Sequence, residues 1–600
     1  MTFESILRSA RRPVILAVLV VLVAAFSAVR PSVGRATACS DDWPMFRHDP
    51  LHQGVSCETT LGASNAPSLK LDWSVGTGAT SYSSPAVVYN ATLGESLVYV
   101  GNQGGQMNAY DATSGGLVWS YQVPKTAGLS KEIETSPEVY NNVVYFGAGD
   151  YHEYALNATT GTLICTSPSA GGIIAGSTVV GNPDGVAGHD VVYYADSGPS
   201  GSASDGGHQW AMWAVGDTGG AQCTTRWVLG AFPGQSGVYS TQAYGSNQSG
   251  TPVVVFGTTD PDDAVYALDA RTGSQLWRFQ TQQGIDSDVG APPTISPPGV
   301  NRLADGAVYV TGKDGITYAI DLSTGQQIWD YTAIGHPAQS GASLVGRTIY
   351  LGFSKGLIAL DAVTGAQVWT SASSSSPSVS MPSISGATGD QVIFRGDMAG
   401  VLHADSLASG ASLFTYPTAA PGSGVFIFSS PAISTGRVFI ANSAGTLFAF
   451  GLNANSPSIS SVSPTAGPTS GGTAVTISGS AFQAGAAVTF GSSPATGVRV
   501  LGSSTIVATS PAGSGTVAVT VTNPDGTSAS LSNAFTYVVG LTCHTSTGSP
   551  SGQPTVLSGR PYTGGSDAVG VAQGATNAYF AEGYTGTGFQ EYLTVQNPGA

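Results

Sequence analysis

A repeated sequence pattern constrains the fold of this chain more than any other feature. Between Val87 and Leu452, eight variants occur of one unit: an apolar strand, a Gly turn, a second strand ending in Ala-x-Asp, a Thr-Gly turn and a Trp. The clearest copies are AVYALDARTGSQLW, ITYAIDLSTGQQIW and LIALDAVTGAQVW, which end at Trp277, Trp329 and Trp369. Self-similarity of this kind indicates a fold that is assembled from one repeated supersecondary unit.

The first and last units are incomplete, and each supplies what the other lacks. LDWSVG carries Trp73 without an Ala-x-Asp strand before it, whereas TLFAFGL, which ends at Leu452, stops before its Trp strand. A closed ring pairs two such ends in one sheet and removes an exposed edge, which a linear solenoid does not do. The sequence therefore predicts an all-β fold in which residues 67–454 form an eight-bladed β-propeller.

The Trp of each unit is predicted to fill the space between neighbouring blades, which is a packing role and not a catalytic one. In weaker copies Cys165 and Phe414 stand in the Trp position, and Trp227 comes late. We expect Cys165 and Phe414 to mark the looser contacts between blades. The predicted blade-packing residues are Trp73, Trp119, Trp277, Trp329 and Trp369.

The N-terminal segment and the charge balance favour an exported protein. Arginines precede an apolar run over residues 13–29, and a small-x-small site ends at Ala38, so residues 1–38 are predicted to be a signal peptide or an N-terminal anchor. Residues 39–66 form a lead-in segment. The net charge of −16 argues against nucleic acid as a partner, because phosphates need clustered Lys and Arg. The expected location is extracellular or at the cell surface, with the membrane reached only through the N-terminal anchor.

Export makes oxidation of the five cysteines the expectation. Cys39 and Cys57 flank DDWPMFRHDPLHQGVS, and we predict that a disulfide pins this segment to the propeller. Cys165 and Cys223 fall late in consecutive repeats, and we predict that they pair as well. Cys543 is left over.

The repeated sequence unit does not occur after Leu452, where a different β-rich pattern begins. SVSPTAGPTSGGTAVTISG and the later NPDG and NAFTYV resemble the IPT/TIG immunoglobulin-like family, which implies a small β-sandwich at residues 455–540. Residues 541–600 are interpreted as a linker and the start of a further, incomplete β-rich module.

The Ala-x-Asp-x-x-Thr-Gly-x-x-x-Trp unit and the segment DWPMFRHDPLHQG resemble the pyrroloquinoline-quinone (PQQ) repeat family over residues 42–452. The resemblance implies a propeller; some members of the family are quinone-dependent alcohol or sugar dehydrogenases, and others are scaffolds. The alcohol-oxidising branch typically has two adjacent cysteines, which this chain lacks. No catalytic position of the family could be matched. The prediction is therefore no cofactor and no catalytic, cofactor-binding or metal residue, with PQQ and Ca²⁺ as the alternative.

Other chemistry-bearing patterns have a structural interpretation. TTDPDDAV, with Asp260, Asp262 and Asp263, and GIDSDVG, with Asp286 and Asp288, lack the spacing of a calcium loop and are interpreted as solvated turns. His48 and His52 stand four residues apart, but nearby prolines disfavour a helix and no third metal ligand is evident. Ser354 in GFSKG lies between two blade strands and is predicted to be a hairpin residue, not a nucleophile.

His208 and Trp210 follow the insertion GPSGSASDGG and are the candidate ligand loop, for a sugar or a peptide; the alternative is an ordinary loop anchor. The leading hypothesis is a non-enzymatic exported or cell-surface binding protein that recognises a surface protein or a glycan. Two alternatives stay open. One is a PQQ- and Ca²⁺-dependent dehydrogenase, and the other is an envelope assembly scaffold, which would need a lipid on Cys39.

Overall fold

The computed structural model describes residues 40–538, apart from residues 169–173, 184–189, 198–207, 214–222, 231, 234–235, 283–286, 301–302, 333–339, 355, 372–373, 375, 453–456 and 525–526. The predicted signal or anchor (residues 1–38) and the predicted incomplete module (residues 541–600), which contains Cys543, lie outside the described residues. Within the described part, no helix is long and apolar enough to cross a membrane.

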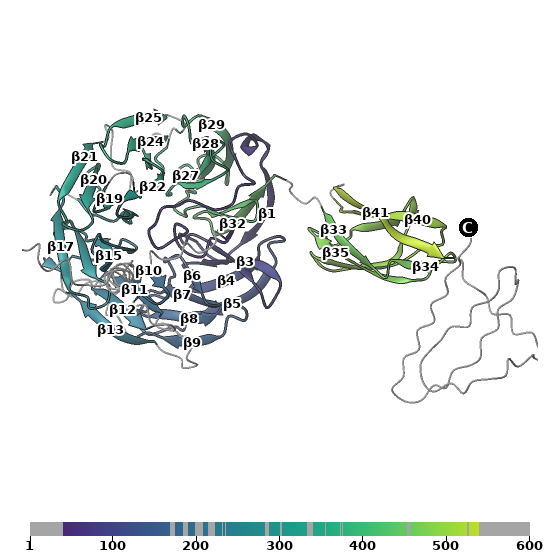
Figure 1. Cartoon of the computed structure of the whole chain (residues 1–600). Helices are drawn as coiled ribbons and strands as arrows, with labels where there is room; N and C mark the ends of the chain where they lie inside the picture. The colour runs from purple at the N-terminus through teal and green to yellow at the C-terminus, as the bar shows by residue number, and fades with distance from the viewer. Residues whose placement is uncertain are drawn as a thin grey trace, which may run out of the picture. The chain divides into compact units, whose positions relative to one another are not determined.

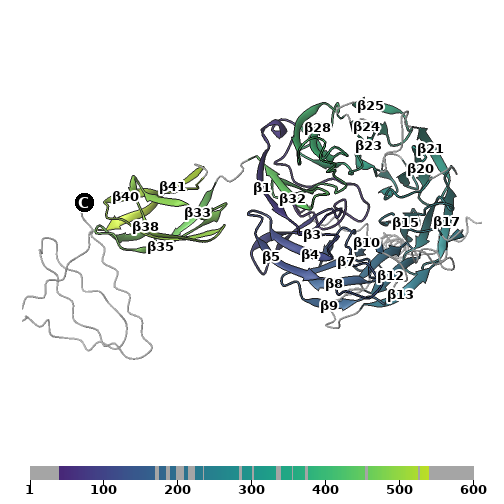
Figure 2. The same ribbon diagram turned by 180° about the vertical axis from the view of Figure 1, so that it is seen from behind.

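Eight four-stranded antiparallel sheets lie around a ring in the described residues before Leu452 (Figures 1 and 2). In the ring, strands such as β6, β10 and β22 lie near the centre, and strands such as β9, β13 and β17 lie at the rim (Figure 1). The sheets are numbered here as blades in chain order, with the sheet that contains both ends as blade 8.

The first four blades have the following strands. They are β2 (Ala86–Asn90), β3 (Glu95–Gly101), β4 (Gln106–Asp111) and β5 (Leu117–Gln122) in blade 1; β6 (Glu138–Tyr140), β7 (Val143–Gly147), β8 (Glu153–Asn157) and β9 (Leu163–Thr166) in blade 2; β10 (Ile174–Val180), β11 (Val191–Asp196), β12 (Gln209–Trp213) and β13 (Thr224–Leu229) in blade 3; and β14 (Ala243–Ser246), β15 (Pro252–Gly257), β16 (Ala264–Asp269) and β17 (Gln275–Gln280) in blade 4.

The other four blades follow the same order. They are β18 (Thr294–Ser296), β19 (Ala307–Thr311), β20 (Ile316–Asp321) and β21 (Gln327–Thr332) in blade 5; β22 (Ser343–Val345), β23 (Thr348–Phe353), β24 (Gly356–Asp361) and β25 (Gln367–Ser371) in blade 6; β26 (Ser383–Ser385), β27 (Val392–Gly396), β28 (Val401–Ser406) and β29 (Ser412–Pro417) in blade 7; and β30 (Ala432–Ser434), β31 (Arg437–Ala441), β32 (Thr446–Gly451) and β1 (Lys70–Gly76), which follows the 3-10 turn η2 (Ala66–Ser68), in blade 8.

The ring closes through its two sequence ends, as the split repeat predicted. β1 pairs with β32 in antiparallel register from Lys70 opposite Gly451 to Gly76 opposite Thr446. The outermost strand of blade 8 therefore comes from the N-terminal side of the chain, and the other three come from the C-terminal side. Pairing the two ends in this way leaves neither of them as an open sheet edge.

Each Trp of the repeat packs against the Thr-Gly turn of the next blade. The indole Nε1 of Trp277 donates to the carbonyl of Leu322 at 2.9 Å, and a Cβ built on Gly325 would lie 2.7 Å from the indole. Gly325 also has φ +72°, so both the turn and the close approach require glycine. The same contact recurs in the pairs Trp73–Gly115, Trp119–Gly161, Trp227–Gly273, Trp329–Gly365 and Trp369–Gly410.

The two substituted Trp positions are filled in different ways, and only Cys165 departs from the prediction of looser contacts. Cys165 forms a disulfide with Cys223, with a Cα–Cα distance of 5.8 Å, so a covalent bond joins blades 2 and 3 where a Trp is missing. The looser-contact prediction for Cys165 is therefore wrong. Phe414 makes an edge contact with Phe450 of blade 8 at 6.2 Å between ring centroids. Cys57 is disulfide-bonded, and its predicted partner Cys39 lies outside the described residues.

The described residues from Ser458 to Val538 form a two-sheet sandwich around its own core, which includes Val475, Ile477 and Phe535. The predicted fold class, a β-propeller followed by an immunoglobulin-like sandwich, is confirmed. One sheet has the order β33 (Ser458–Ser463), β35 (Ala474–Ser480), β39 (Thr505–Thr509), β38 (Thr496–Gly502); the other has the order β34 (Ala466–Pro468), β41 (Ser528–Val538), β40 (Gly515–Thr522), β36 (Ala487–Phe490), β37 (Ser493–Pro494).

Candidate functional site

Residues 42–63, here called the axis segment, run around the ring axis against the innermost strands. Backbone hydrogen bonds join Trp43 to Val87, Leu51 to Ile295 and Gly54 to Ile384. Further bonds of the same segment reach the innermost strands of blades 2, 4 and 6 through backbone groups, and that of blade 8 through the Ser56 hydroxyl. Figure 1 shows this purple part of the chain inside the ring. The innermost strands are sheet edges, so the axis segment covers edges that would otherwise be unpaired.

Arg47 is the buried centre of the axis segment. Its Nε donates to the carbonyl of His52 at 2.8 Å, and its Nη2 donates to the Ser343 hydroxyl at 3.1 Å and to the carbonyl of Ala342. Burial lowers the pKa of Arg47 to about 9. Burial and the charge of Arg47 also lower the pKa of His52 to about 3, so this imidazole is neutral at physiological pH.

Hydroxyl side chains tie successive innermost strands together around the axis, which the sequence interpretation missed. The Thr294 hydroxyl donates to the carbonyl of Ala342 in the next blade at 2.6 Å, and the Ser383 hydroxyl does the same to Pro431. In six blades, a second hydroxyl bonds to the backbone near the end of the blade's second strand. These residues are Ser83, Thr135, Ser240, Ser340, Ser378 and Ser429. The sequence signal that could have indicated these hydroxyl contacts is the recurrence of SSPAVV, TSPEVY and SSPAIS.

Two carboxyl groups are buried between blades 2 and 3. Glu138 and Glu153 are both fully buried, and each has carboxyl oxygens without a hydrogen-bond partner among the described residues. Burial raises the pKa of Glu153 to about 8, with the nearby Ser177 hydroxyl opposing the shift. Burial also raises the pKa of Glu138 well above its usual value, against the effect of the backbone N–H of Val179. The Glu153 carboxyl is therefore largely protonated at neutral pH.

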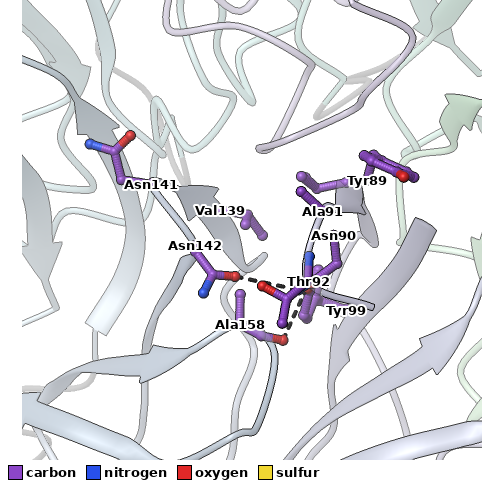
Figure 3. A pocket seen from close by; sticks show the side chains of 10 residues that line it. Tyr89, Asn90, Ala91, Thr92, Tyr99, Val139, Asn141, Asn142 and Ala158 are labelled. Atoms are coloured by element: carbon purple, nitrogen blue, oxygen red, sulfur yellow. Dashed lines mark hydrogen bonds between the residues drawn. The ribbon is translucent and has the colours of Figure 1, made fainter. Parts of the chain in front are cut away.

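A pocket of about 250 Å³ opens between the hairpins of blades 1 and 2 (Figure 3). The β2–β3 turn brings Tyr89, Asn90 and Thr92 to it, and the β6–β7 turn brings Asn141 and Asn142. The other lining residues are Val88, Ala91, Tyr99, Val139 and Ala158. The sequence interpretation passed over these residues because the Asn-Asn pair reads as an ordinary hairpin turn, and only the fold brings the two turns together.

The candidate ligand residues His208 and Trp210 lie against one carboxylate. Trp210 donates from Nε1 to Oδ2 of Asp196 at 2.7 Å and stacks on Tyr194 at 5.9 Å, and His208 Nδ1 lies 3.3 Å from Oδ1 of Asp196. This geometry fits the loop-anchor alternative. The insertion before His208, residues 198–207, lies outside the described residues, so a ligand role for the two side chains stays a prediction.

The acidic turns come together in space but are bound by other groups. The backbone N–H of Asp260 donates to Asp288 at 2.7 Å, and Lys313 Nζ lies 2.6 Å from the same carboxylate. Arg278 pairs with Asp262. Burial, and then the neighbouring carboxylates, raise the pKa of Asp263 to about 6. Asp286 lies outside the described residues.

The structure explains the His48–His52 pair and the GFSKG stretch. His52 is enclosed in the axis segment, with Nδ1 3.1 Å from the carbonyl of Pro293, and His48 lies beside Trp43 at 5.1 Å between ring centroids. Ser354 lies in the turn between β23 and β24. That hairpin position is the one expected from the repeat, and it lacks the strand-to-helix turn that a GxSxG nucleophile needs.

Two solved structures share the fold. One is a quinohemoprotein alcohol dehydrogenase from Comamonas testosteroni, with a TM-score of 0.54 and 17% identity over 72% of this chain and 83% of that one. The other is a europium-containing methanol dehydrogenase, with a TM-score of 0.54 and 15% identity over 68% of this chain and 98% of that one. At these identities the likeness shows the fold alone.

The curated relatives match over shorter stretches. The quinohemoprotein alcohol dehydrogenase ADH-IIG of Pseudomonas putida is 42% identical over 85 residues, 13% of this chain and 11% of the relative. The tetrathionate hydrolase of Acidithiobacillus ferrooxidans is 30% identical over 152 residues, 25% of this chain and 26% of the relative. The chain thus spans about a tenth to a quarter of the length of these relatives.

These comparisons correct the prediction that the chain takes no cofactor. Quinohemoprotein and quinone-dependent alcohol dehydrogenases recur among its relatives, so a cofactor-free assignment does not stand. The prediction was wrong because it rested on the lack of adjacent cysteines and of any matched catalytic position. Those features mark one branch of a large family, and their absence does not exclude a cofactor held by other residues.

The described residues around the axis lack the groups that would hold a quinone with its Ca²⁺. Such a pair needs free cationic donors for the quinone carboxylates and several oxygen ligands for the metal. Arg47 uses Nε and Nη2 for the carbonyl of His52 and the Ser343 hydroxyl, and its remaining Nη1 is buried without a hydrogen-bond partner among the described residues. No three His, Cys, Asp or Glu side chains within the described ranges gather closely enough to hold a metal ion. This part of the chain therefore does not fit the pair.

Two family models match the chain. The PQQ-repeat model, described as outer membrane protein assembly factor BamB, matches residues 58–210, 201–382 and 261–478, which together cover more than half of the sequence. The IPT/TIG domain model matches residues 457–537, where the structure has its two-sheet sandwich. The repeated Ala-x-Asp hairpins, their closed ring and these matches agree, and the chain belongs to the PQQ-repeat β-propeller family and carries an IPT/TIG domain.

Proposed function

We propose that this chain is an exported or cell-surface binding protein that uses its propeller as a rigid recognition scaffold for a protein or a glycan. The observation that supports this function best is the axis segment. It bonds to the innermost strands of seven blades and encloses Arg47 and His52. Because the chain itself fills this part of the axis, recognition falls to the loops and hairpins on the outer faces of the ring, where propellers commonly carry binding sites.

The way in which the blades are joined also supports a scaffold. Trp–Gly contacts, the Cys165–Cys223 disulfide and the strand pair β1–β32 each connect neighbouring blades or close the ring. A ring fixed at so many points holds its surface loops in constant positions, which lowers the entropy lost on binding.

The second candidate is a quinone-dependent alcohol or sugar oxidoreductase. The printed names of several relatives, among them the quinohemoprotein alcohol dehydrogenase of Comamonas testosteroni, favour it. The description of the matching family model favours an envelope assembly scaffold in the same way. These names describe proteins that share only part of their length with this chain.

A paired experiment separates the scaffold from the oxidoreductase. The purified chain is screened on a glycan array and against surface proteins, with heat-unfolded chain as the control. The same preparation is assayed for dye reduction with alcohols and sugars, with and without added PQQ and Ca²⁺. A reproducible ligand without quinone-dependent turnover supports the scaffold. Dye reduction that depends on PQQ overturns it in favour of the oxidoreductase, and the absence of any ligand for the folded chain contradicts it directly.

A further inference from the structure

We propose that the pocket between blades 1 and 2 binds a neutral saccharide. The inference rests on the proposed recognition function and names its ligand class and place. The pocket has a volume of about 250 Å³, which accommodates a sugar ring better than a drug-sized molecule. It is built from two hairpin turns on the face of the ring where the Thr-Gly turns also lie.

The lining of the pocket excludes a charged ligand. None of its ten residues carries an ionisable acid or base that is charged at neutral pH. Two carboxylates bond to lining residues: Asp42 accepts a hydrogen bond from the backbone N–H of Tyr89 at 2.9 Å, and Asp190 accepts one from Nδ2 of Asn141 at 2.9 Å. An anion would meet repulsion there, and a cation would lose its hydration for carboxylates that lie outside the lining and already accept hydrogen bonds from Tyr89 and Asn141. The ligand that fits is polar and uncharged.

Asn142 is held by neighbours that leave one of its polar groups available. Its Oδ1 accepts from Asn90 Nδ2 at 3.3 Å and from the Thr159 hydroxyl at 3.1 Å. These bonds fix the amide, and Nδ2 makes no hydrogen bond within the described residues. Figure 3 shows Asn142 facing Thr92 across the pocket. An amide and a hydroxyl offer donors and acceptors together, which matches sugar hydroxyl groups that also do both.

Tyr89 lies at the rim of such a site. The residue is 55% exposed, and Figure 3 shows its ring on the side of Asn90 away from Asn142. An exposed Tyr offers a flat apolar face with a polar tip, which suits the C–H face and the hydroxyl rim of a sugar ring.

The equivalent hairpin of blade 6 is charged where that of blade 2 is neutral. In blade 6, Arg347 Nε pairs with Asp361 at 2.6 Å. The backbone bond from Ala362 to Arg347 corresponds to the one from Ala158 to Asn142, so Asn142 and Asn157 occupy the positions of that ion pair. Blade 2 thus has two amides where blade 6 has a guanidinium and a carboxylate.

The test uses the whole chain and titrates it with neutral methyl glycosides of hexoses and N-acetylhexosamines, by saturation-transfer NMR and calorimetry. We expect saturable binding of at least one glycoside and weaker binding of the matching methyl glucuronide. The variant Asn142→Gly tolerates the positive φ of +59° at this position and removes the side-chain amide. It should weaken glycoside binding about tenfold, because one hydrogen bond to the ligand is lost. Tyr89→Ala should weaken it as well.

The matched control is Thr435→Gly, which changes a residue of φ +53° in the β30–β31 turn and does not line the pocket. It should bind like the unaltered chain, and melting curves verify that all variants are folded. If no glycoside binds, or if Asn142→Gly and Tyr89→Ala leave affinity unchanged, the pocket proposal is overturned. A glycoside that binds equally well to both variants would keep the recognition function and place its site elsewhere.

Discussion

At the scale of single residues, one carbonyl group in several of these turns organises the contact between blades. The carbonyl of Ala158 accepts from Trp119 Nε1 at 2.9 Å and from the Tyr99 hydroxyl at 3.2 Å. The same double acceptance occurs at Ala270 and Ala362, with the pairs Trp227–Tyr193 and Trp329–Tyr309. The repeat therefore specifies a hydrogen bond together with a packing contact, so the indole has a fixed orientation on the turn.

The glycine of this turn should be intolerant of a methyl group for two reasons. We expect Gly325→Ala to lower the free energy of unfolding by about 1–3 kcal/mol, because the new Cβ would overlap the Trp277 indole in addition to its unfavourable φ. Gly315→Ala is the control, since Gly315 has φ +79° with no atom within 4 Å of a built Cβ. Chemical denaturation measures both. Equal losses in the two variants would show that the close approach contributes nothing.

The buried carboxyl of Glu153 should make stability depend on pH. Its pKa is about 4.5 in an unfolded chain and about 8 in the folded one, so between these values folding requires uptake of a proton. Its stabilising contribution is complete below about pH 4.5 and is lost as the pH rises toward 8, with a slope that approaches about 1.4 kcal/mol per pH unit.

The variant Glu153→Gln should flatten this dependence and raise stability at pH 8 relative to the unaltered chain. Urea denaturation across this pH range measures the effect, with the exposed residue in Glu134→Gln as the control. A pH dependence that is identical in the Glu153→Gln variant would mean that other groups, such as the neighbouring Glu138, are responsible.

At the scale of elements, blades 2 and 3 are joined by chemistry that differs from the other interblade contacts. Blade 1 packs Trp119 on Gly161 of blade 2, but blade 2 ends in β9 with Cys165, which bonds to Cys223 just before β13. A disulfide between outer strands replaces an indole and its hydrogen bond. The same two blades enclose Glu138 and Glu153, so this interface combines a covalent link with a polar interior.

We expect the double variant Cys165→Ser/Cys223→Ser to be less stable by about 2–4 kcal/mol, the usual effect of removing a disulfide that closes a long loop. The two cysteines are separated by 58 residues. Thermal melting with and without a reductant tests this: reduction should lower the melting temperature of the unaltered chain and have a smaller effect on the variant. A variant that melts like the oxidised chain would show that the outer strands are held by other contacts.

At the scale of the whole molecule, the propeller is closed twice. The strand pair β1–β32 closes its circumference, and the axis segment joins the innermost strands around the centre. Both devices use the N-terminal side of the repeat region, so residues far apart in sequence, such as Trp73 and Ala449, become neighbours. Folding of the last blade therefore depends on residues at the start of the described chain.

Deletion of residues 67–78, which contain β1, should open the ring and lower the melting temperature of the propeller markedly. The deletion removes the Trp73 contact with Gly115 and leaves β32 as an unpaired edge that invites aggregation. Calorimetry and size-exclusion chromatography measure the result, with Lys70→Ala at an exposed position of the same strand as the control. Unchanged melting and solution size would contradict the closed ring.

Much of the fold could be predicted because each copy of the repeat contains the residues that form its own hairpin and its packing face. Asp321 and the Thr-Gly that follows it specify the hairpin by side-chain acceptance and a positive φ, and the Trp position specifies the packing face. The candidate site could be predicted only in part. His208 and Trp210 were chosen from their loop, but their shared contact with Asp196 across the sheet was not visible in the sequence. The pocket was missed because Tyr89 and Asn142 lie in different repeats.

The strand repeat, the ring closure and the sandwich can be inferred from the amino-acid sequence, because they follow from side-chain period, turn chemistry and complementary ends. Three features emerge only in the folded ring: residues 42–63 occupy the axis, Glu138 and Glu153 are buried between two blades with unpaired carboxyl oxygens, and two turns form a neutral pocket. Each of these depends on groups from separate blades meeting at set distances, and such distances are set by the packing of the whole ring rather than by any local stretch of the chain.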